Sequence, residues 1–336
     1  MNRFSYTRAT DVSSALQAHH APAAAFLAGG TNLVDLIKEG VARPERLVDI
    51  RRLPMKAIEP AANGGVRIGA LATNSAVAYD ERILSRYPLL SKAILAGASA
   101  QIRNVATVGG NMLQRTRCHY FYDTATPCNK RDPGTGCGAM NGVNRIHAIL
   151  GTSEHCIAVH PSDMCVALAA LDATVHVTGD QGDRAIPFDA FHRLPGDTPQ
   201  KDTNLSDDEM IVAVELPAEE FVEHHAYVKV RDRASFAFAL VAVALAIKLD
   251  GDRIDDVRCA LGGVAHMPWR DREAEAALRG KTLTPAAVRD FASAMVRDAR
   301  GRPGNAFKIE LTTRAIVRAF EQASGQRLAA SDEDRT

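Results

Sequence analysis

The chain has 336 residues, enough for two or three domains that each have a core. Its 40 basic residues balance 40 acidic ones, so its charge gives no support for binding to nucleic acid or to an anionic membrane surface. Aromatic residues, at 5%, are too sparse to suggest the stacking platforms that bind single-stranded nucleic acid.

The N-terminal residues Met1 to Tyr6 contain no apolar segment and no small-residue cleavage site, so we expect no export signal on this chain. The longest apolar run, 236–247, is too short to span a bilayer and predicts a buried strand. In a reducing compartment, clustered cysteines favour metal over disulfides. A partner that carries a signal could still export the folded chain, so the compartment stays open.

The first motif is a Gly-Gly loop. An apolar run, Ala23–Ala28, ends in Gly29-Gly30 and predicts a strand and a tight turn. Thr31-Asn32 then precedes Leu33–Ile37, whose apolar spacing predicts a helix capped by Thr31 or Asn32. Free N–H groups at such a helix start suit a pyrophosphate, although a plain strand-turn-helix unit explains the same pattern. The loop is neither a Walker A nor a GxGxxG sequence.

A second Gly-Gly loop, Thr107–Asn111, follows further along the chain. Between the two loops we predict strands at 47–50 and 65–71, a helix after Thr73-Asn74, and a helix over 87–101. The two loops could converge on one diphosphate from two sides. Two unrelated turns are the alternative.

Residues 115–153 lack sustained apolar periodicity, and a loop of this length is usually functional or held together by something other than a core. Four cysteines lie in or beside it: Cys118, Cys128, Cys137 and Cys156. The segment has no Cys-x-x-Cys pair, so no common cluster or zinc pattern fits. An iron–sulfur cluster, a zinc site with His119, His147 or His155 as substitute ligands, disulfides, and unpaired thiols all stay open.

The remaining elements indicate a domain boundary at about residue 220. Before it we predict an apolar segment at 165–173, strands at 174–177 and 210–216, a turn at 180–183 and a loop from 186 to about 205. After it we predict strands at 227–230, 236–249 and 254–261, and helices at 272–278, 285–300 and 309–324. Cys165, Cys259, His160 and His266 are expected to be structural.

At this point the sequence resembles a known family, the FAD-binding subunits of molybdenum hydroxylases of the xanthine dehydrogenase and carbon monoxide dehydrogenase group. The resemblance covers nearly the whole chain and is carried by Leu27–Leu33, by Ile102–Asn111 and by the block from Tyr227. It implies an α+β fold with a two-subdomain FAD-binding (PCMH-type) domain over residues 1–220, divided at about residue 55. A C-terminal domain of the CO dehydrogenase flavoprotein type, with a small antiparallel sheet and helices, would cover 221–330.

The cysteine-rich insertion, 115–156, is similar to that of the FAD subunit of bacterial periplasmic aldehyde oxidoreductases, and 4-hydroxybenzoyl-CoA reductases have a comparable insertion. In those subunits it holds a [4Fe-4S] cluster. The resemblance therefore implies cluster ligands at Cys118, Cys128, Cys137 and Cys156. Simple xanthine dehydrogenases lack the insertion, so the chain departs from them here.

The resemblance also assigns the FAD site. The first Gly-Gly loop would bind the FAD diphosphate through Leu27, Ala28, Gly29, Gly30, Thr31, Asn32 and Leu33. The second loop would form the other wall through Thr107, Gly109, Gly110 and Asn111. Asp163 would lie near the adenosine half of FAD, with a plain turn residue as the alternative. Lys229 would lie near the flavin ring, with an exposed strand lysine as the alternative.

The implied function is that of an electron-transfer flavoprotein subunit of an oxidoreductase. Electrons would come from a large molybdenum-cofactor subunit and a small [2Fe-2S] subunit of a heterotrimer, and would pass through FAD to an external acceptor. Substrate oxidation would occur on the partner, so no catalytic acid or base is assigned here. Co-export with a signal-bearing partner would place the protein in the periplasm, with the cytoplasm as the alternative. A free-standing FAD-dependent reductase or oxidase and a zinc-stabilised scaffold module are the competing interpretations.

Overall fold

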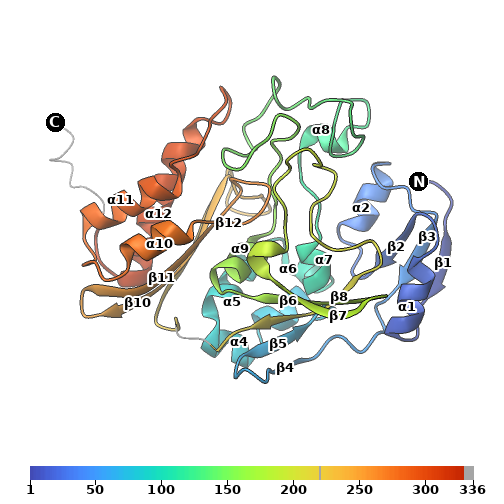
Figure 1. The fold of residues 1–336 in the computed structure, drawn as a ribbon, viewed down its shortest axis with the longest axis horizontal. Helices are drawn as coiled ribbons and strands as arrows, with labels where there is room; N and C mark the ends of the chain where they lie inside the picture. Colours follow the sequence, from blue (N-terminus) through green and yellow to red (C-terminus); the bar gives the residue numbers. More distant parts are fainter. Residues whose placement is uncertain (219–220, 329–336) are drawn as a thin grey trace.

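Three sheets form the framework of the protein in the computed structural model, which describes residues 1–218 and 221–328 (Figure 1). The predicted domain boundary at about residue 220, and the end of the C-terminal domain at 330, lie outside the described residues. In the described part of the chain, no helix combines the length and the apolar character needed to cross a bilayer.

The N-terminal part is a parallel three-stranded sheet in the order β1–β3–β2. Its strands are β1 (Ser5–Arg8), β2 (Ala24–Leu27) and β3 (Arg46–Asp49), and its helices are α1 (Val12–His19) and α2 (Leu33–Lys38). Parallel strands need crossover connections, and α1 and α2 provide them. The predicted strand, turn and helix around the first Gly-Gly loop are therefore confirmed as β2, the loop and α2.

The second sheet has five antiparallel strands in the order β4–β5–β8–β6–β7. These are β4 (Ile58–Pro60), β5 (Val66–Gly69), β6 (Thr174–Gly179), β7 (Gly182–Pro187) and β8 (Met210–Leu216). Between β5 and β6 the chain forms α3 (Asn74–Ala78), α4 (Glu81–Arg86), α5 (Pro88–Ala96), α6 (Ala100–Arg103), α7 (Val108–Met112), α8 (His119–Tyr122) and α9 (Asp163–Ala170). A 3-10 turn, η1 (Phe188–Ala190), follows β7. The main core lies between this sheet and the buried helices α5 and α9.

The C-terminal sheet is antiparallel, in the order β12–β11–β10–β9. It contains β9 (His224–Val230), β10 (Val241–Asp250), β11 (Arg253–Gly262) and β12 (Trp269–Arg270), followed by α10 (Arg272–Leu278), α11 (Pro285–Met295) and α12 (Phe307–Ser324). Ala244 and Ala246 of β10 pack into the core shared with α9, whereas Val243 and Leu245 pack into the core shared with α11 and α12. This period of two follows from the alternation of side chains across a strand and explains why β10 is apolar on both faces from Val241 to Ile247.

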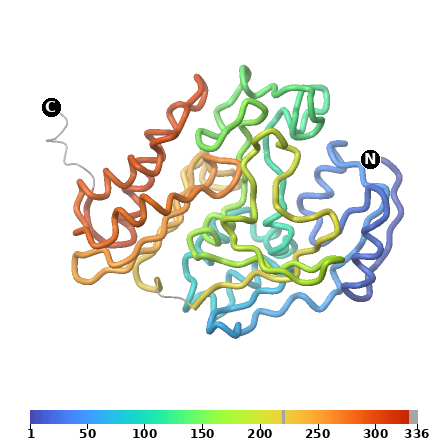
Figure 2. Tube along the Cα trace, in the orientation of Figure 1, coloured from blue at the N-terminus to red at the C-terminus, as the bar shows by residue number. Residues whose placement is uncertain are grey.

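The cysteine-rich insertion lies across the top of the molecule in Figure 2, between the N-terminal sheet and the C-terminal helices. On one side, Arg117 pairs with Asp35 of α2 at 3.2 Å. On the other side, Asn144 accepts a hydrogen bond from the Gly304 N–H at 3.1 Å. The insertion shares a small apolar cluster with its neighbours, in which Cys118, Phe121, Cys128 and Ala139 pack with Leu36 of α2 and with Ile157. The expectation that it lacks any core is therefore corrected.

Three further predictions are corrected by the structure. The helix predicted over 87–101 ends at Ala96, because the chain turns through Ala98, which has a φ of +51°, before α6 begins. The strand predicted over 236–249 begins only at Val241, and 236–240 is a loop. The loop predicted from 186 overlaps β7, because this strand continues to Pro187 beside β6.

Candidate functional site

The first Gly-Gly loop depends on its glycines for contact with the second loop. A Cβ on Gly29 would lie 2.2 Å from the carbonyl oxygen of Val105, which no side chain tolerates. Gly30 has a φ of +74°, in the left-handed region that favours glycine. The first loop therefore packs directly against the backbone of Val105 and Ala106, which leads into the second loop, and this fits the hypothesis that the two loops converge.

The loop leads into the N-terminus of α2 with unused donors. From Gly30 to Leu33, no backbone N–H donates a hydrogen bond to an acceptor in the described protein. Asn32 is the N-cap residue, but its side chain makes no capping bond; its Oδ1 instead accepts the Arg115 N–H at 2.9 Å. Free N–H groups at a helix start attract anions, so this segment can hold a phosphate group.

The second loop is held by hydrogen bonds to the segment after β5. The Gly109 N–H donates to Ala70 O at 2.8 Å, and the Asn74 N–H donates to Ala106 O at 2.9 Å. Thr107 is the N-cap of α7 and accepts the Gly110 N–H through its Oγ1. Gly109 and Thr107 are thus buried residues that shape the loop.

A cavity of about 320 Å³ opens between the two loops; we term it the loop cavity. Of the residues predicted for the FAD site, its lining includes Thr31, Asn32, Gly110, Asn111, Asp163 and Lys229. The other predicted residues, namely Leu27, Ala28, Gly29, Gly30, Leu33, Thr107 and Gly109, do not line this cavity. They lie in the two loops or in the adjoining ends of β2 and α2, and Gly29, Gly30, Thr107 and Gly109 shape the loops.

Asp163 and Lys229 lie together in the structure. The Lys229 Nζ donates to Asp163 Oδ2 at 2.8 Å and to Ala96 O at 3.0 Å, and the Tyr227 hydroxyl donates to Asp163 Oδ1 at 2.7 Å. The side chain of Lys229 is 5% exposed and that of Asp163 is 9% exposed. Burial beside this carboxylate raises the pKa of Tyr227 well above its ordinary value, so its hydroxyl stays a donor. Lys229 is therefore not an exposed strand lysine, and this group joins α9 to β9 at the cavity wall.

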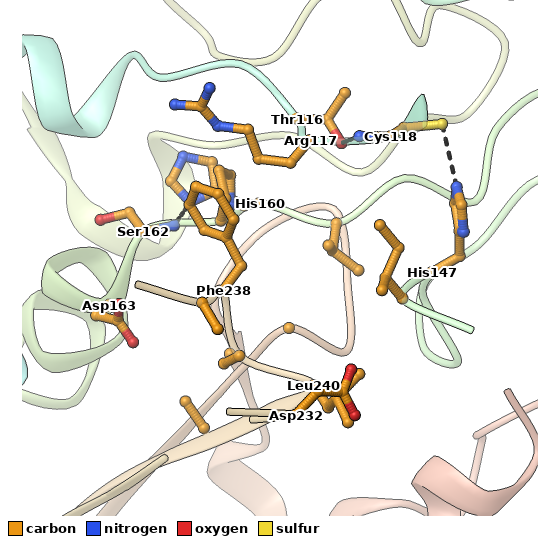
Figure 3. A pocket seen from close by; sticks show the side chains of 18 of the residues that line it. Thr116, Arg117, Cys118, His147, His160, Ser162, Asp163, Asp232, Phe238 and Leu240 are labelled. Carbon is orange, nitrogen blue, oxygen red and sulfur yellow. Dashed lines mark hydrogen bonds between the residues drawn. The ribbon is translucent and has the colours of Figure 1, made fainter. Parts of the chain in front are cut away.

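A second cavity, of about 490 Å³, adjoins the first; we term it the bridging cavity (Figure 3). Both cavities share Arg117, Ser162, Asp163 and the loop residues Phe236 and Phe238. Phe238 is half exposed, and the guanidinium of Arg117 lies 5.0 Å from its ring centroid. The two cavities are therefore adjacent, and residues 236–238 line both of them.

The four clustered cysteines surround a third, small cavity, which we term the cysteine cavity. Cys118, Cys128 and Cys156 are buried and Cys137 is partly buried, and all six cysteines of the chain are free. Cys128 and Cys137 face each other in an antiparallel backbone bridge. Burial raises the pKa of Cys118 to about 12 and that of Cys156 to about 11. Tertiary structure therefore brings the four predicted ligands around one cavity, and no disulfide joins them.

Cys118 connects the cysteine cavity to the bridging cavity. Thr116, Cys118 and His147 line both spaces. Figure 3 shows the His147 ring pointing at the sulfur, with Nε2 3.1 Å from Sγ of Cys118. Burial lowers the pKa of His147 to about 4, so its ring is neutral near pH 7.

Comparison with known proteins agrees with this arrangement. A model of the FAD binding domain in molybdopterin dehydrogenase matches residues 2–219, and a model of the CO dehydrogenase flavoprotein C-terminal domain matches residues 225–323. The chain belongs to the FAD-binding subunits of the molybdenum hydroxylases. It is therefore the FAD subunit of an oxidoreductase.

Individual relatives place this FAD subunit more closely. It is 48% identical to the aldehyde oxidoreductase FAD-binding subunit PaoB of Escherichia coli, over 97% of this chain and 100% of the relative. It is 31% identical to the glyceraldehyde dehydrogenase medium chain of Sulfolobus acidocaldarius, over 86% of each chain. Among solved structures, carbon monoxide dehydrogenase from Hydrogenophaga pseudoflava superposes with a TM-score of 0.75 at 26% identity, over 98% of this chain and 99% of that one. The predicted α+β fold is thereby confirmed.

The loop cavity of this FAD subunit has polar groups that fit a dinucleotide. Four side chains that line it carry a buried nitrogen or oxygen without a partner in the described protein: Asn32 Nδ2, Asn74 Oδ1, Arg103 Nε and Arg117 Nε. Buried polar atoms are rarely left unpaired, so these atoms indicate a polar ligand. Three of the four are donors, which suits the phosphates and carbonyls of FAD.

Sequence reasoning missed Asn74, Arg103, Phe236 and Phe238 as cavity residues. For Asn74 a signal existed, because Thr73-Asn74 repeats the Thr31-Asn32 pair at the start of a helix. The two phenylalanines were hidden in an apolar run that predicted a continuous strand.

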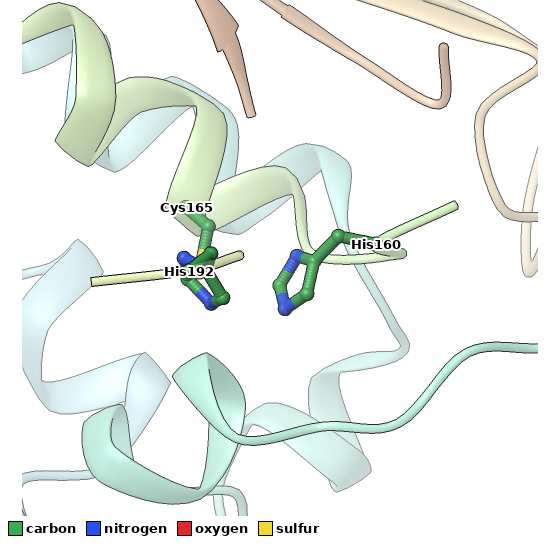
Figure 4. A group of neighbouring side chains, drawn as sticks. All are labelled: His160, Cys165 and His192. Atoms are coloured by element: carbon green, nitrogen blue, oxygen red, sulfur yellow. The ribbon is translucent and has the colours of Figure 1, made fainter. Parts of the chain in front are cut away.

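Beside the second loop of the FAD subunit lies a buried group formed by His160, Cys165 and His192 (Figure 4). Their potential ligand atoms lie within 4.8 Å of one another. Both imidazoles face the Met112 carbonyl through Nε2, at 3.2 and 3.0 Å, and burial lowers the pKa of His192 to about 4. His160 Nδ1 accepts the Ser162 N–H. These neutral rings are hydrogen-bond donors that fix the end of α7, so the structural role expected for His160 and Cys165 fits their contacts.

Two further residues expected to be structural are also buried. His266 donates from Nδ1 to Arg193 O at 2.7 Å, and its Nε2 faces Lys130 Nζ at 2.6 Å. Cys259 lies in β11, and burial raises the pKa of its thiol.

Proposed function

We propose that this chain is the electron-transfer flavoprotein subunit of a molybdenum-containing aldehyde oxidoreductase, and that Cys118, Cys128, Cys137 and Cys156 hold a [4Fe-4S] cluster. Partner subunits with molybdenum and [2Fe-2S] centres supply the electrons, and an external acceptor receives them. The observation that carries the proposal is the shared lining of Cys118 and His147, which joins the cysteine cavity to the space beside the FAD loops.

FAD would supply the capacity to collect single electrons and to release them singly or in pairs. The contribution of this chain is to bind and orient that group. The N–H groups from Gly30 to Leu33 would face the diphosphate, and the opposite wall comes from Gly110 and Asn111. Asp163 and Lys229 line the same space as a fixed ion pair. Because their charged groups are 2.8 Å apart, Asp163 and Lys229 would lie beside the same part of FAD, and not one beside the adenosine half and the other beside the flavin ring.

A metal cluster accounts for the chemistry of the four cysteines better than disulfides or free thiols. All four side chains surround one cavity, and burial raises the pKa of Cys118 and Cys156, which disfavours bare thiolates at these two positions. Bound metal deprotonates a coordinating thiol and removes that penalty. The insertion, which has only a small apolar cluster, would gain stability from four such bonds. Zinc would satisfy the same argument and is tested below.

The aldehyde substrate class is supported by the names of two relatives, an aldehyde oxidoreductase subunit and a glyceraldehyde dehydrogenase chain. A heterotrimer with a small [2Fe-2S] subunit and a large molybdenum-cofactor subunit would provide the substrate site. Periplasmic location through co-export with a signal-bearing partner is part of the proposal. Fractionation of cells that express all subunits tests it, since recovery in the cytoplasmic fraction alone would exclude export.

The central test is an absorption spectrum of the purified protein together with its iron and zinc content. We expect flavin peaks on a broad iron–sulfur shoulder and four irons per chain, with co-purification of two partners. A colourless, zinc-containing protein would support the scaffold interpretation instead. A flavoprotein that oxidises substrate as an isolated chain would support a free-standing reductase or oxidase.

A further inference from the structure

We propose that His147 is a positioning residue for the cluster, which donates a hydrogen bond from Nε2 to the sulfur of Cys118 and thereby raises the reduction potential of the centre. This inference rests on the proposed function, because it requires the [4Fe-4S] cluster. It concerns the one sulfur that also faces the FAD side of the insertion.

The direction of the hydrogen bond follows from the chemistry of the two atoms. The Nε2 to Sγ distance is 3.1 Å, and both side chains are buried. A thiolate that binds iron has no proton to give, so the nitrogen must donate. His147 Nδ1 has no partner in the described protein, which fits a ring whose single proton lies on Nε2.

His147 is held in place from the C-terminal domain. Its carbonyl oxygen accepts Lys308 Nζ at 2.9 Å and Asn305 Nδ2 at 3.3 Å. Its N–H donates to the Asn144 carbonyl at 3.1 Å. All three partners are buried, namely Lys308, Asn305 and Asn144. The peptide N–H and the carbonyl of His147 are therefore both fixed by buried hydrogen bonds. A rigid imidazole can keep one donor aimed at one sulfur, which a surface side chain could not do.

This donor distinguishes Cys118 from the other cysteines. Among the described residues, His147 is the one side chain that donates a hydrogen bond to any of the four sulfurs, whereas Cys156 is contacted by the Ala158 backbone N–H at 3.4 Å. A cluster with four thiolate ligands gains one negative charge when it accepts an electron. A donor to sulfur stabilises the more negative state more strongly, so it raises the potential.

His155 offers a matched control. It also lines the cysteine cavity and neighbours Cys156, but its side chain is half exposed. Its Nε2 faces Asp197 at 3.5 Å, and it makes no hydrogen bond to a sulfur. A histidine close to the cluster without an aimed donor should not affect the potential of the centre.

The experiment is a redox titration of the cluster signal by electron paramagnetic resonance on the full complex, with iron content measured on the same samples. We expect H147L to keep four irons per chain and to shift the midpoint potential downward. H147Q, which retains an N–H donor, should recover part of the shift, and H155L should leave the midpoint potential at the wild-type value. Turnover is not needed for any of these measurements.

The outcomes separate this inference from the proposed function. Absence of a [4Fe-4S] signal in the wild-type complex would refute the cluster itself. A wild-type cluster whose midpoint potential is the same in H147L would overturn the hydrogen-bond role while leaving the cluster intact. Loss of iron in both H147L and H147Q would also overturn it, because His147 would then be needed to assemble the site.

Discussion

Gly29 and Val105 are in such close contact that a methyl group on the glycine would lie 2.2 Å from the Val105 carbonyl oxygen. The residue at position 29 therefore decides whether the two Gly-Gly loops can share one cavity. The first loop follows β2 of the N-terminal sheet, and the second loop lies in the helical segment between β5 and β6, so the contact also fixes that sheet against that segment.

Replacement of Gly29 by alanine should separate the two loops. The clash is with backbone rather than with a flexible side chain, and overpacking of this kind costs about 1–3 kcal/mol. We expect a lower thermal midpoint and a strong loss of bound flavin. Gly251, at the exposed tip of the β10–β11 hairpin, has a φ of +61° and open space around it. The control G251A should lower stability through backbone strain without changing the flavin content.

Replacement of Cys128 by serine should lower the iron content and loosen the insertion. Cys128 lines the cysteine cavity, and its backbone forms an antiparallel β-bridge with that of Cys137. Loss of this ligand would therefore weaken both the proposed cluster and the loop that the cluster closes. Iron analysis and limited proteolysis of the insertion measure the two effects. In contrast, C165A alters a buried thiol of α9 outside the cysteine cavity and should keep all the iron. Full iron content in C128S would remove Cys128 from the ligand set.

The D163N substitution should destabilise the protein through Lys229. It would leave the buried ammonium without its counter-ion, and breaking a buried pair in this way costs about 3–5 kcal/mol. Urea unfolding measures the change, and flavin content shows whether the cavity wall is disturbed. The double variant D163L/K229M should recover much of the loss. For comparison, E310Q removes the exposed Glu310–Arg314 pair, and its effect should stay below about 1 kcal/mol.

The stability of the protein should depend on pH through Asp202. Its carboxylate pairs with Lys130 and Arg115, and these cations, opposing the effect of burial, hold its pKa at about 2 against an ordinary value of 3.8. Because the folded-state pKa is depressed, the stabilisation is present above about pH 4 and is lost as the pH falls towards 2. It amounts to about 2 kcal/mol when the carboxylate is fully ionised.

Urea midpoints of the wild type and D202N at several pH values test this dependence. The difference in urea midpoint between the wild type and D202N should be constant from pH 7 to pH 5 and should become smaller below about pH 4. A gap that is independent of pH down to pH 3 would show that the carboxylate contributes only by shape or by neutral hydrogen bonding.

Much of the local structure is encoded in short stretches of sequence. The Gly-Gly turn before α2, strand β8 and helix α10 follow from patterns of a few residues, because turn glycines, apolar alternation and helix caps act locally. Prediction failed where a non-local contact overrode the local pattern. At Ala98 a helical sequence turns, and the Arg103 guanidinium then donates to Gly97 O at 2.7 Å. The apolar residues 236–240 line the bridging cavity instead of extending β10.

The sequence by itself determined the residue types of the site: two Gly-Gly loops, four clustered cysteines and a resemblance that joins them in one family. Only the tertiary structure decided which of these residues meet. It brings Gly29 against Val105, pairs Asp163 with Lys229, and aims His147 at Cys118. The physical reason is that these contacts are fixed by packing between sheets and helices distant in the chain, whereas local patterns act only over a few neighbouring residues.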